Sequence, residues 1–133
     1  MQKYLHEMLL EIDSDLDLLN STYKNNPMIK LLFDLCYNKS NKFNLPSGII
    51  NYKSNGYKVD LAPINLFSEL TSLKMFCRKD IKESKLLSIF IQLLEQLSEN
   101  DVKILLAIKN QDLSKLYPRL SVSNLKPYGY SYN

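Results

Sequence analysis

Tryptophan is absent from the sequence, alanine occurs only at Ala62 and Ala107, and glycine occurs at only three positions. The glycines, Gly48, Gly56 and Gly129, lie too far apart to build a glycine-rich phosphate loop. A β-sandwich or barrel needs many tight turns, which three glycines do not favour, so their scarcity also argues against those folds.

Residues with reactive side chains are few. Histidine occurs once, as His6, and the two cysteines, Cys36 and Cys77, lie far apart within apolar patterns. This spacing excludes a zinc site, and we interpret both cysteines as buried, reduced thiols and His6 as a surface residue. Paired carboxylates such as Glu95 and Glu99 lie where helix surfaces usually carry solvated charge. The sequence therefore predicts a protein that is not an enzyme and needs no metal, cofactor or small-molecule substrate.

Long apolar runs are also missing. No run approaches the ~20 residues that a membrane-spanning helix needs, and the N-terminus lacks the apolar core of a secretory signal. Apolar residues make up 45% of the chain and charged residues 23%, which is typical of a soluble globular protein. We therefore expect a cytoplasmic protein in a reducing compartment, without a membrane partner.

Helical periodicity runs through most of the chain. It is clearest over residues 84–124, where apolar residues recur every three or four positions from Leu87 to Leu97. Ser98 then interrupts, with Asp101 three residues on, in an arrangement that resembles a capping box and predicts the start of a second helix. Because the connection is almost nil, we expect these two helices to fold against each other.

The same reading extends to the whole chain, whose 133 residues suit one domain with a single core. We expect one compact all-α domain over 1–133, with about six helices and a long irregular basic loop after the second. The predicted helices cover 3–23, 28–38, 63–79, both sides of Ser98 and a short stretch after Ser121, and the tail over 128–133 is expected to fray.

The irregular loop, residues 38–62, contains four lysines and no acidic residue before Asp60. Asn55-Gly56 could close a short hairpin between INYK and YKV. A long irregular segment inside a compact domain is more often functional than idle. The segment is therefore a candidate binding element.

Charge is unevenly placed along the chain. The first 24 residues carry two basic and five acidic side chains, net −3, and the remainder carries fifteen basic and nine acidic side chains, net +6. Such asymmetry is compatible with a nucleic-acid partner. Basic residues interleaved with tyrosines could hold phosphates, and the helix starts at Ser98 and Ser121 offer backbone N–H groups.

The candidate DNA-binding residues are Lys39, Lys42, Lys53, Lys58, Lys115, Arg119, Ser121 and Lys126. A second basic stretch holds Lys74, Arg78, Lys79, Lys82 and Lys85. The alternative interpretation is an ordinary loop with solubilising lysines and ordinary helix caps.

The order of features resembles a known domain. An amphipathic helix precedes LLFDLCYNKSNKFNLPSGI, a helix ends near RKD, and LLEQLSENDVKILLAIKNQDLSKL is followed by a short Ser-capped helix. Over about residues 5–128 this resembles the N-terminal helical DNA-binding domain of ATP-dependent DNA ligases, especially phage ligases. It is also similar to a small phage-encoded family of unknown function that shares FIQLLEQL and LYPRLSVSNLKPYGY-like ends.

The resemblance implies an all-helical fold that binds duplex DNA independently of sequence, through backbone and minor-groove contacts. Gln111 precedes Asp112-Leu113 where the ligase pattern has a basic residue, and the ligase catalytic lysine motif is absent, which excludes ligation. We therefore expect a non-enzymatic accessory duplex-DNA-binding protein, phage-encoded and acting in the host cytoplasm. The alternative is a protein–protein interaction module that docks on host or phage replication or transcription machinery.

Overall fold

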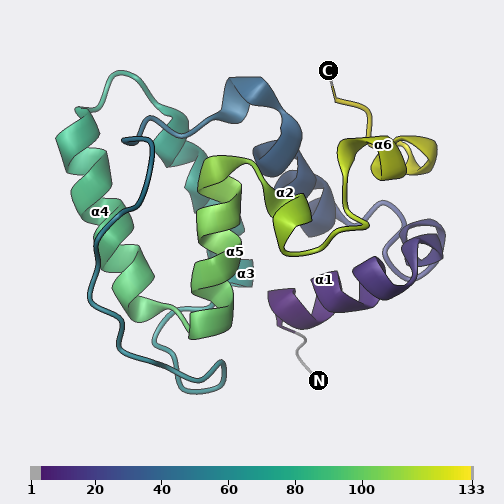
Figure 1. Cartoon of the computed structure of the whole chain (residues 1–133), viewed down its shortest axis with the longest axis horizontal. Coiled ribbons are helices and arrows are strands. Elements are labelled where there is room, and N and C mark those ends of the chain that lie inside the picture. Colours follow the sequence, from purple (N-terminus) through teal and green to yellow (C-terminus); the bar gives the residue numbers. More distant parts are fainter. Residues whose placement is uncertain (1–3, 133) are drawn as a thin grey trace.

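Six α-helices, joined by 3-10 turns and one long irregular segment, form the fold of residues 4–132, the part of the chain that the computed structural model describes (Figure 1). The helices are α1 (Leu5–Ser14), α2 (Pro27–Tyr37), α3 (Leu66–Glu69), α4 (Glu83–Gln96), α5 (Glu99–Asn110) and α6 (Val122–Leu125). The 3-10 turns are η1 (Leu16–Asn20), η2 (Lys39–Asn41), η3 (Leu70–Cys77), η4 (Leu113–Lys115) and η5 (Lys126–Tyr128). No strand occurs in residues 4–132, so the predicted single all-α domain is confirmed. None of these helices is both long and apolar enough to cross a membrane.

The helix predicted over 3–23 is wrong as one continuous element. Lys3 lies outside the described residues, and α1 ends at Ser14 because Asp15 adopts an extended conformation, with φ −149° and ψ 95°. The Asp15 side chain accepts a hydrogen bond from the Asp17 N–H and caps η1. Short polar side chains compete for backbone hydrogen bonds in this way, and here that competition outweighs the apolar periodicity.

The helix predicted over 63–79 begins later and changes type. Its N-cap is Asn65, whose side chain accepts from the Phe67 N–H over 2.9 Å, and after four residues α3 passes into η3. Leu70, Leu73 and Phe76 are buried at every third position of η3. A 3-10 helix has three residues per turn, so this spacing places all three side chains on one face.

The hairpin suggested at Asn55-Gly56 does not form. The Lys53 N–H donates to the Glu95 side chain over 3.2 Å, and the Asn55 amide donates to the Glu95 carbonyl over 2.7 Å. The segment therefore donates hydrogen bonds to the end of α4, and it does not pair with a second strand.

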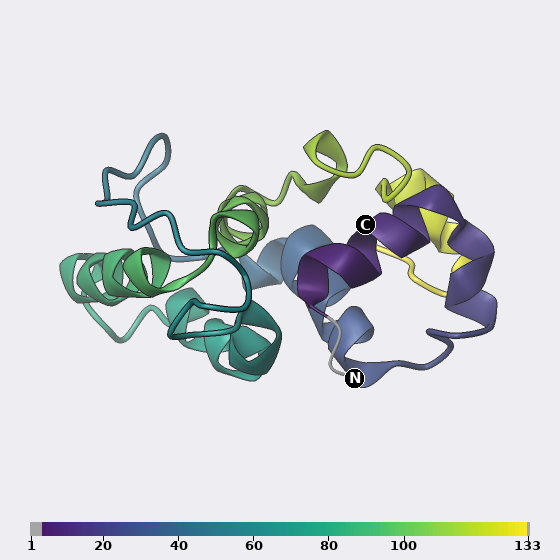
Figure 2. The same cartoon turned by 90° about the horizontal axis from the view of Figure 1, so that it is seen from below.

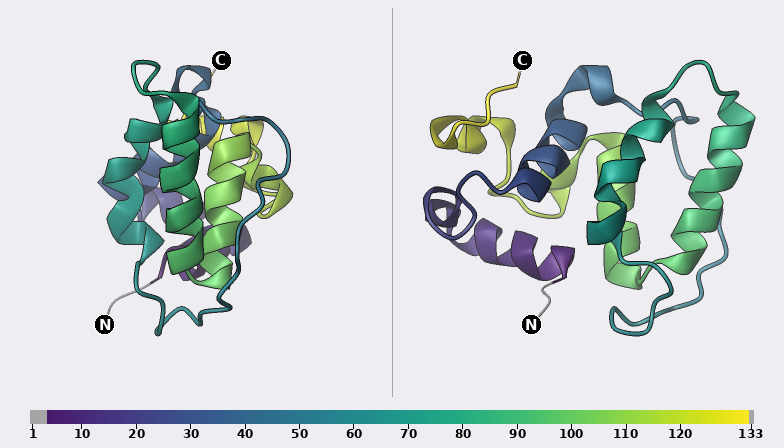
Figure 3. Two further views of the ribbon diagram at one scale, coloured as in Figure 1. Left: turned by 90° about the vertical axis from the view of Figure 1, so that its left-hand side faces the viewer. Right: turned by 180° about the vertical axis from the view of Figure 1, so that it is seen from behind.

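α5 is the central helix of the fold. It lies closest to α2 and α1, and its Ile104, Leu105 and Ile108 are all buried. α4 runs antiparallel to α5 after the short connection at Leu97–Ser98, but the two helices diverge and do not pack closely along their length (Figure 3), so the expectation that they fold against each other is wrong. The predicted helix start at Ser98 is confirmed, since its hydroxyl accepts from the Asp101 N–H over 3.2 Å.

An aromatic cluster fills the core between η3, α4 and the irregular segment. The rings of Phe43, Phe76 and Phe90 lie with centroids between 5.3 and 6.2 Å apart. All three side chains are at most 4% exposed. Phe43 thereby ties the start of the irregular segment to the helical core.

The tail packs on α2, where we had expected it to fray. Tyr130 is 6% exposed, and its ring meets that of Phe33 edge-on at 4.9 Å between centroids. Tyr132 lies near Tyr37, with ring centroids 6.0 Å apart. Burial of aromatic area outweighs the loss of chain entropy here, and only residue 133 of the predicted tail lies outside the described residues.

Candidate nucleic-acid interface

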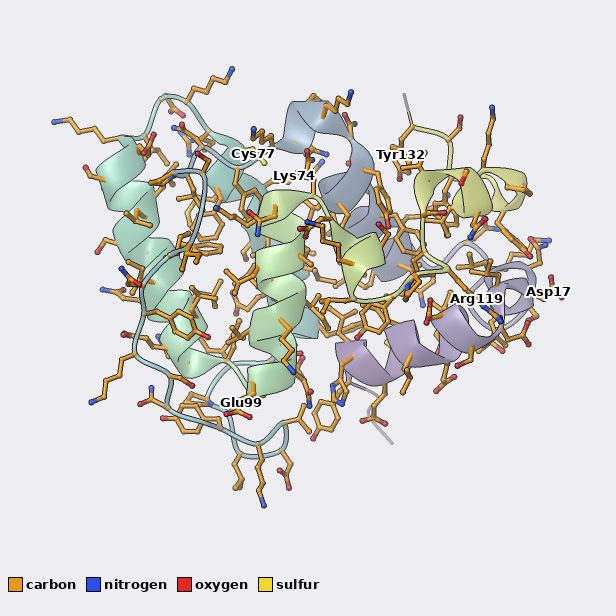
Figure 4. The ribbon with its side chains drawn as sticks, in the orientation of Figure 1. Asp17, Lys74, Cys77, Glu99, Arg119 and Tyr132 are labelled. Atoms are coloured by element: carbon orange, nitrogen blue, oxygen red, sulfur yellow. The ribbon has the colours of Figure 1, made fainter. Side chains whose placement is uncertain are left out.

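Two basic segments that are far apart in the sequence lie side by side along one edge of the molecule. They are residues 39–42, at η2, and residues 74–85, which run from the end of η3 into the first turn of α4. The Cys77 thiol donates to the Asn41 carbonyl over 3.0 Å and fixes one segment against the other. We call the two segments together the basic edge, and Figure 4 shows it along the top, near the labelled Cys77.

The basic edge carries seven basic and two acidic side chains. Lys74 Nζ lies 3.8 Å from Asp34 Oδ2, and Arg78 Nε donates to Asp80 Oδ1 over 2.9 Å. The hydrogen bond from Arg78 lowers the pKa of the Asp80 carboxyl, so this pair stays ionised. The remaining lysines are exposed and have no carboxylate within 4.0 Å among residues 4–132. These free lysines are Lys39, Lys42, Lys79, Lys82 and Lys85.

A hollow of about 440 Å³ opens between the basic edge and the end of α5. Lys109, 6% exposed, forms part of its wall, and Lys109 Nζ donates to the Gly48 carbonyl over 3.0 Å. Burial lowers the pKa of the Lys109 ammonium, and the charge of Lys42 lowers it further. The lining of this Lys109 hollow comprises Lys42, Phe43, Leu45, Pro46, Ser47, Glu83, Lys109, Asn110 and Gln111.

Residues 44–58, which we call the strap, run along one side of α4 and α5 (Figure 2). The strap is bonded to the connection between these helices, because the Glu99 N–H donates to the Tyr57 carbonyl over 3.2 Å. Two hollows of about 340 and 520 Å³ lie between the strap and α5, and Tyr52 and Leu106 line both. They form a groove along α5 that is lined by both apolar and polar side chains.

Comparison with known proteins places the chain in a family. The sequence model of DUF6433, described as a family of unknown function, matches residues 13–115. The chain belongs to this family. No curated protein and no solved structure matches it. The ligase resemblance and the phage origin stay predictions. The basic edge, the strap and the Lys109 hollow all lie within the DUF6433 range, whereas α6 and the tail lie outside it.

In the structure of this DUF6433 protein, only two of the eight predicted DNA-binding residues belong to the basic edge. Lys39 and Lys42 both belong to the basic edge. Lys53 and Lys58 lie on the strap near the junction of α4 and α5, whereas the basic edge includes the opposite end of α4 (Figure 1). Lys115 forms an ion pair with Asp112, with a distance of 3.5 Å.

The other three predicted residues lie with the acidic N-terminal elements. The Arg119 N–H donates to Asp13 Oδ1 over 2.9 Å, and Figure 4 shows Arg119 near Asp17. Ser121 caps the four-residue α6, and Lys126 begins η5, whose Tyr128 donates to the Asp17 carboxylate over 3.0 Å. This cluster is a structural contact between the two ends of the fold, far from the basic edge.

The backbone N–H groups that were predicted to contact phosphate at the start of α5 already donate to acceptors within the protein. The Glu99 and Asp101 N–H groups donate to Tyr57 and Ser98, and Ser98 itself is 1% exposed. Two acidic residues in the first turn of α5 also disfavour a phosphate.

Sequence reasoning missed two parts of the candidate interface in this DUF6433 protein. The basic stretch over 74–85 was visible, but its place beside residues 39–42 depends on contacts between distant segments. Lys109 falls inside the apolar pattern of α5, where a lysine looks like an exposed interruption. No sequence signal distinguishes it from a solvated side chain.

One further pair of titratable groups is buried outside this interface. Asp101 is 2% exposed, and its Oδ2 accepts from the Leu66 N–H over 3.1 Å. Asp101 Oδ1 and His6 Nδ1 are buried without a hydrogen-bond partner, and His6 is half-buried where we expected a surface residue. No group of three or more metal-ligating side chains occurs in residues 4–132.

Proposed function

We propose that this DUF6433 protein binds double-stranded DNA without sequence preference, as a non-enzymatic accessory protein. The observation that carries the proposal is the basic edge, where two bonded segments hold five exposed lysines without acidic partners. Each lysine that meets a phosphate releases a condensed counterion, which is the main source of non-specific DNA affinity. The resemblance of the sequence to the DNA-binding domain of DNA ligases implies backbone contacts with duplex DNA, which agrees with this function.

The charge distribution favours one orientation on DNA. Asp13, Asp15 and Asp17 lie between the last turn of α1 and η1, and Figure 4 shows Asp17 on the other side of the molecule from Cys77. A polyanion is attracted to the basic edge and repelled by this acidic end. The protein therefore approaches DNA with α4 and η2 leading.

Duplex DNA fits the basic edge better than a single strand does. Single-strand binding proteins combine basic grooves with exposed aromatic rings on which bases stack. The single aromatic residue of the basic edge is Phe76, which is 2% exposed. Phosphate contacts are therefore the interaction that the edge can offer.

A mobility shift with random-sequence duplex across a salt series tests this function. The variant Lys79→Gln/Lys82→Gln/Lys85→Gln removes three free charges from the edge. Because log affinity falls with log salt by about 0.9 for each phosphate contact, its salt slope should be shallower by roughly 2 to 3. The matched control is Lys53→Gln/Lys58→Gln/Lys126→Gln, which removes the same charge elsewhere and should keep most of the slope.

Two outcomes contradict the proposal. The first is wild-type affinity weaker than ~10⁻⁴ M at low salt, which is poorer than ordinary non-specific binding. The second is an equal loss in the two triple variants, because the effect would then follow net charge and not the basic edge.

The alternative function, a protein–protein interaction module for host or phage machinery, has one specific observation in its favour. Ile49 is 94% exposed at the rim of the groove between the strap and α5, and Leu61 is 70% exposed. An exposed apolar residue at the rim of a groove is typical of protein contact sites, and Leu61 is a second exposed apolar residue outside the groove lining. Failure of the duplex test would leave this function as the better one.

A further inference from the structure

The Lys109 hollow contains a buried cation that forms no ion pair with any of the described residues. Lys109 is 6% exposed, and no carboxylate of residues 4–132 lies within 4.0 Å of its ammonium group. Its acceptor is a neutral carbonyl, that of Gly48. Lysines are almost never so fully buried unless they are paired with an anion. The ammonium group has three donors, and the Gly48 carbonyl uses one of them.

The surroundings of Lys109 add further positive charge. A second cation, Lys42, lines the same hollow and lowers the pKa of Lys109. Asp112 acts in the opposite direction, but it is already engaged by Lys115 at 3.5 Å. Glu83 is the one carboxylate among the lining residues, and it is exposed in the first turn of α4.

The end of α5 accounts for part of the burial only. Lys109 lies in the last turn of α5, where the helix dipole favours a positive charge. This contribution applies equally to an exposed lysine, so it does not explain why the side chain turns into a polar hollow. An anion in the hollow would explain it.

We propose that the Lys109 hollow binds a phosphate group, held by the ammonium groups of Lys109 and Lys42. Ser47 and Asn110 also line the hollow and supply neutral donors. At about 440 Å³ the hollow has room for a phosphate together with part of the molecule that carries it. The proposal rests on the proposed function in one respect, because a phosphodiester of DNA is the ligand that the adjoining basic edge would deliver.

Thermal unfolding in the presence of inorganic phosphate tests the pocket directly. The midpoint of the wild-type protein should rise by several degrees in phosphate, relative to chloride at the same pH and ionic strength. Lys109→Met should be at least as stable as wild type in chloride, because it removes a buried charge, and should show no rise in phosphate. An unchanged wild-type midpoint, or an equal rise in Lys109→Met, overturns the proposal.

Two exposed substitutions keep the test valid if Lys109→Met fails to fold. Lys42→Gln removes a cation that lines the hollow and should lower the phosphate-dependent rise by at least half. Lys85→Gln removes a free lysine of the basic edge that does not line the hollow and should leave the rise unchanged. Equal responses of these two variants would show a general charge effect and reject the pocket.

Duplex binding distinguishes the source of the phosphate. If DNA is the ligand, Lys109→Met should weaken duplex affinity about tenfold and inorganic phosphate should compete with the duplex. A phosphate-dependent rise without any duplex binding keeps the pocket and rejects the DNA function, and the ligand is then a free phosphorylated compound. Duplex binding that depends on Lys79, Lys82 and Lys85, with no phosphate response, keeps the function and rejects the pocket.

Discussion

Two charged side chains are buried in α5, one at each end of the helix. Asp101 lies in the first turn and is 2% exposed, and Lys109 lies in the last turn and is 6% exposed. The backbone dipole of a helix favours a negative charge at its start and a positive charge at its end. Each residue therefore occupies the end of α5 that suits its sign, although neither has a charged partner within hydrogen-bonding distance.

The carboxyl of Asp101 should make stability depend on pH. Burial raises its pKa, and the Leu66 N–H, His6 and Ser98 oppose this shift without cancelling it. Because the folded-state pKa lies above the unfolded value, folding favours the protonated form, and this contribution is lost as pH rises through the folded-state pKa. Relative to Asp101→Asn, which keeps an acceptor for the Leu66 N–H, wild type should lose stability as the pH rises above about 4, the ordinary pKa of an aspartate.

Urea unfolding of both proteins at a series of pH values measures this difference. The groups that face Asp101 are His6 on α1 and Tyr117, whose own pKa is raised mainly by burial and in part by Asp101. The comparison should therefore be repeated in a His6→Gln background, where the same trend is expected. A wild-type advantage that grows toward pH 7 would contradict the burial argument.

At the scale of single elements, helix starts are predictable from the sequence and tertiary neighbours are not. The start after Ser98 is confirmed, and α2 begins at Pro27, one residue before the predicted bound, because caps are local in sequence. The break at Asp15 was missed because the bond between the Asp15 side chain and the Asp17 N–H outweighs the apolar periodicity. The basic edge could not be derived, since it requires residues 39–42 and 74–85 to meet.

The strap offers an element-scale prediction. Glu95 Oε2 accepts from the Lys53 N–H, so Glu95→Ala should expose this amide and speed its hydrogen exchange, together with that of neighbouring strap amides. The cost in global stability should be small, about 0.5–1.5 kcal/mol, because the bond is exposed to solvent. Gln92→Ala, an exposed change on the same helix, is the matched control and should leave strap exchange unchanged. Slow exchange in Glu95→Ala would show that the remaining contacts of the strap, such as the bond from Asn55 to the Glu95 carbonyl, hold it without the Glu95 carboxylate.

At the scale of the whole molecule, the C-terminal residues 119–132 pack against the end of α1 and against α2. The Tyr37 hydroxyl donates to the Leu120 carbonyl, and the Arg119 side chain donates to the Ser14 carbonyl over 3.1 Å. Tyr130 packs against Phe33. The tail is therefore part of the core and not an appendage.

Removing the buried ring should reveal this role. Tyr130→Ala should lower the free energy of unfolding by about 3 kcal/mol, as the loss of a buried aromatic side chain usually does. Tyr130→Phe keeps the ring contact and should cost much less, and Tyr132→Ala, which truncates a half-buried residue, should lie between them. Chemical denaturation measures all three. Equal stability of Tyr130→Ala and wild type would mean that the tail does not pack on α2 in solution.

The central position of α5 has a consequence for protein synthesis. Its closest helical neighbours are α2 and α1, but it ends at residue 110, long after both have been made. At ribosomal rates of 5–20 residues per second, the apolar faces of α1 and α2 stay uncovered by α5 for roughly 5–20 s after the helices have been made. We therefore expect holding chaperones to bind the nascent chain over that interval, so that the yield in cells depends on them more than the stability of the finished fold suggests.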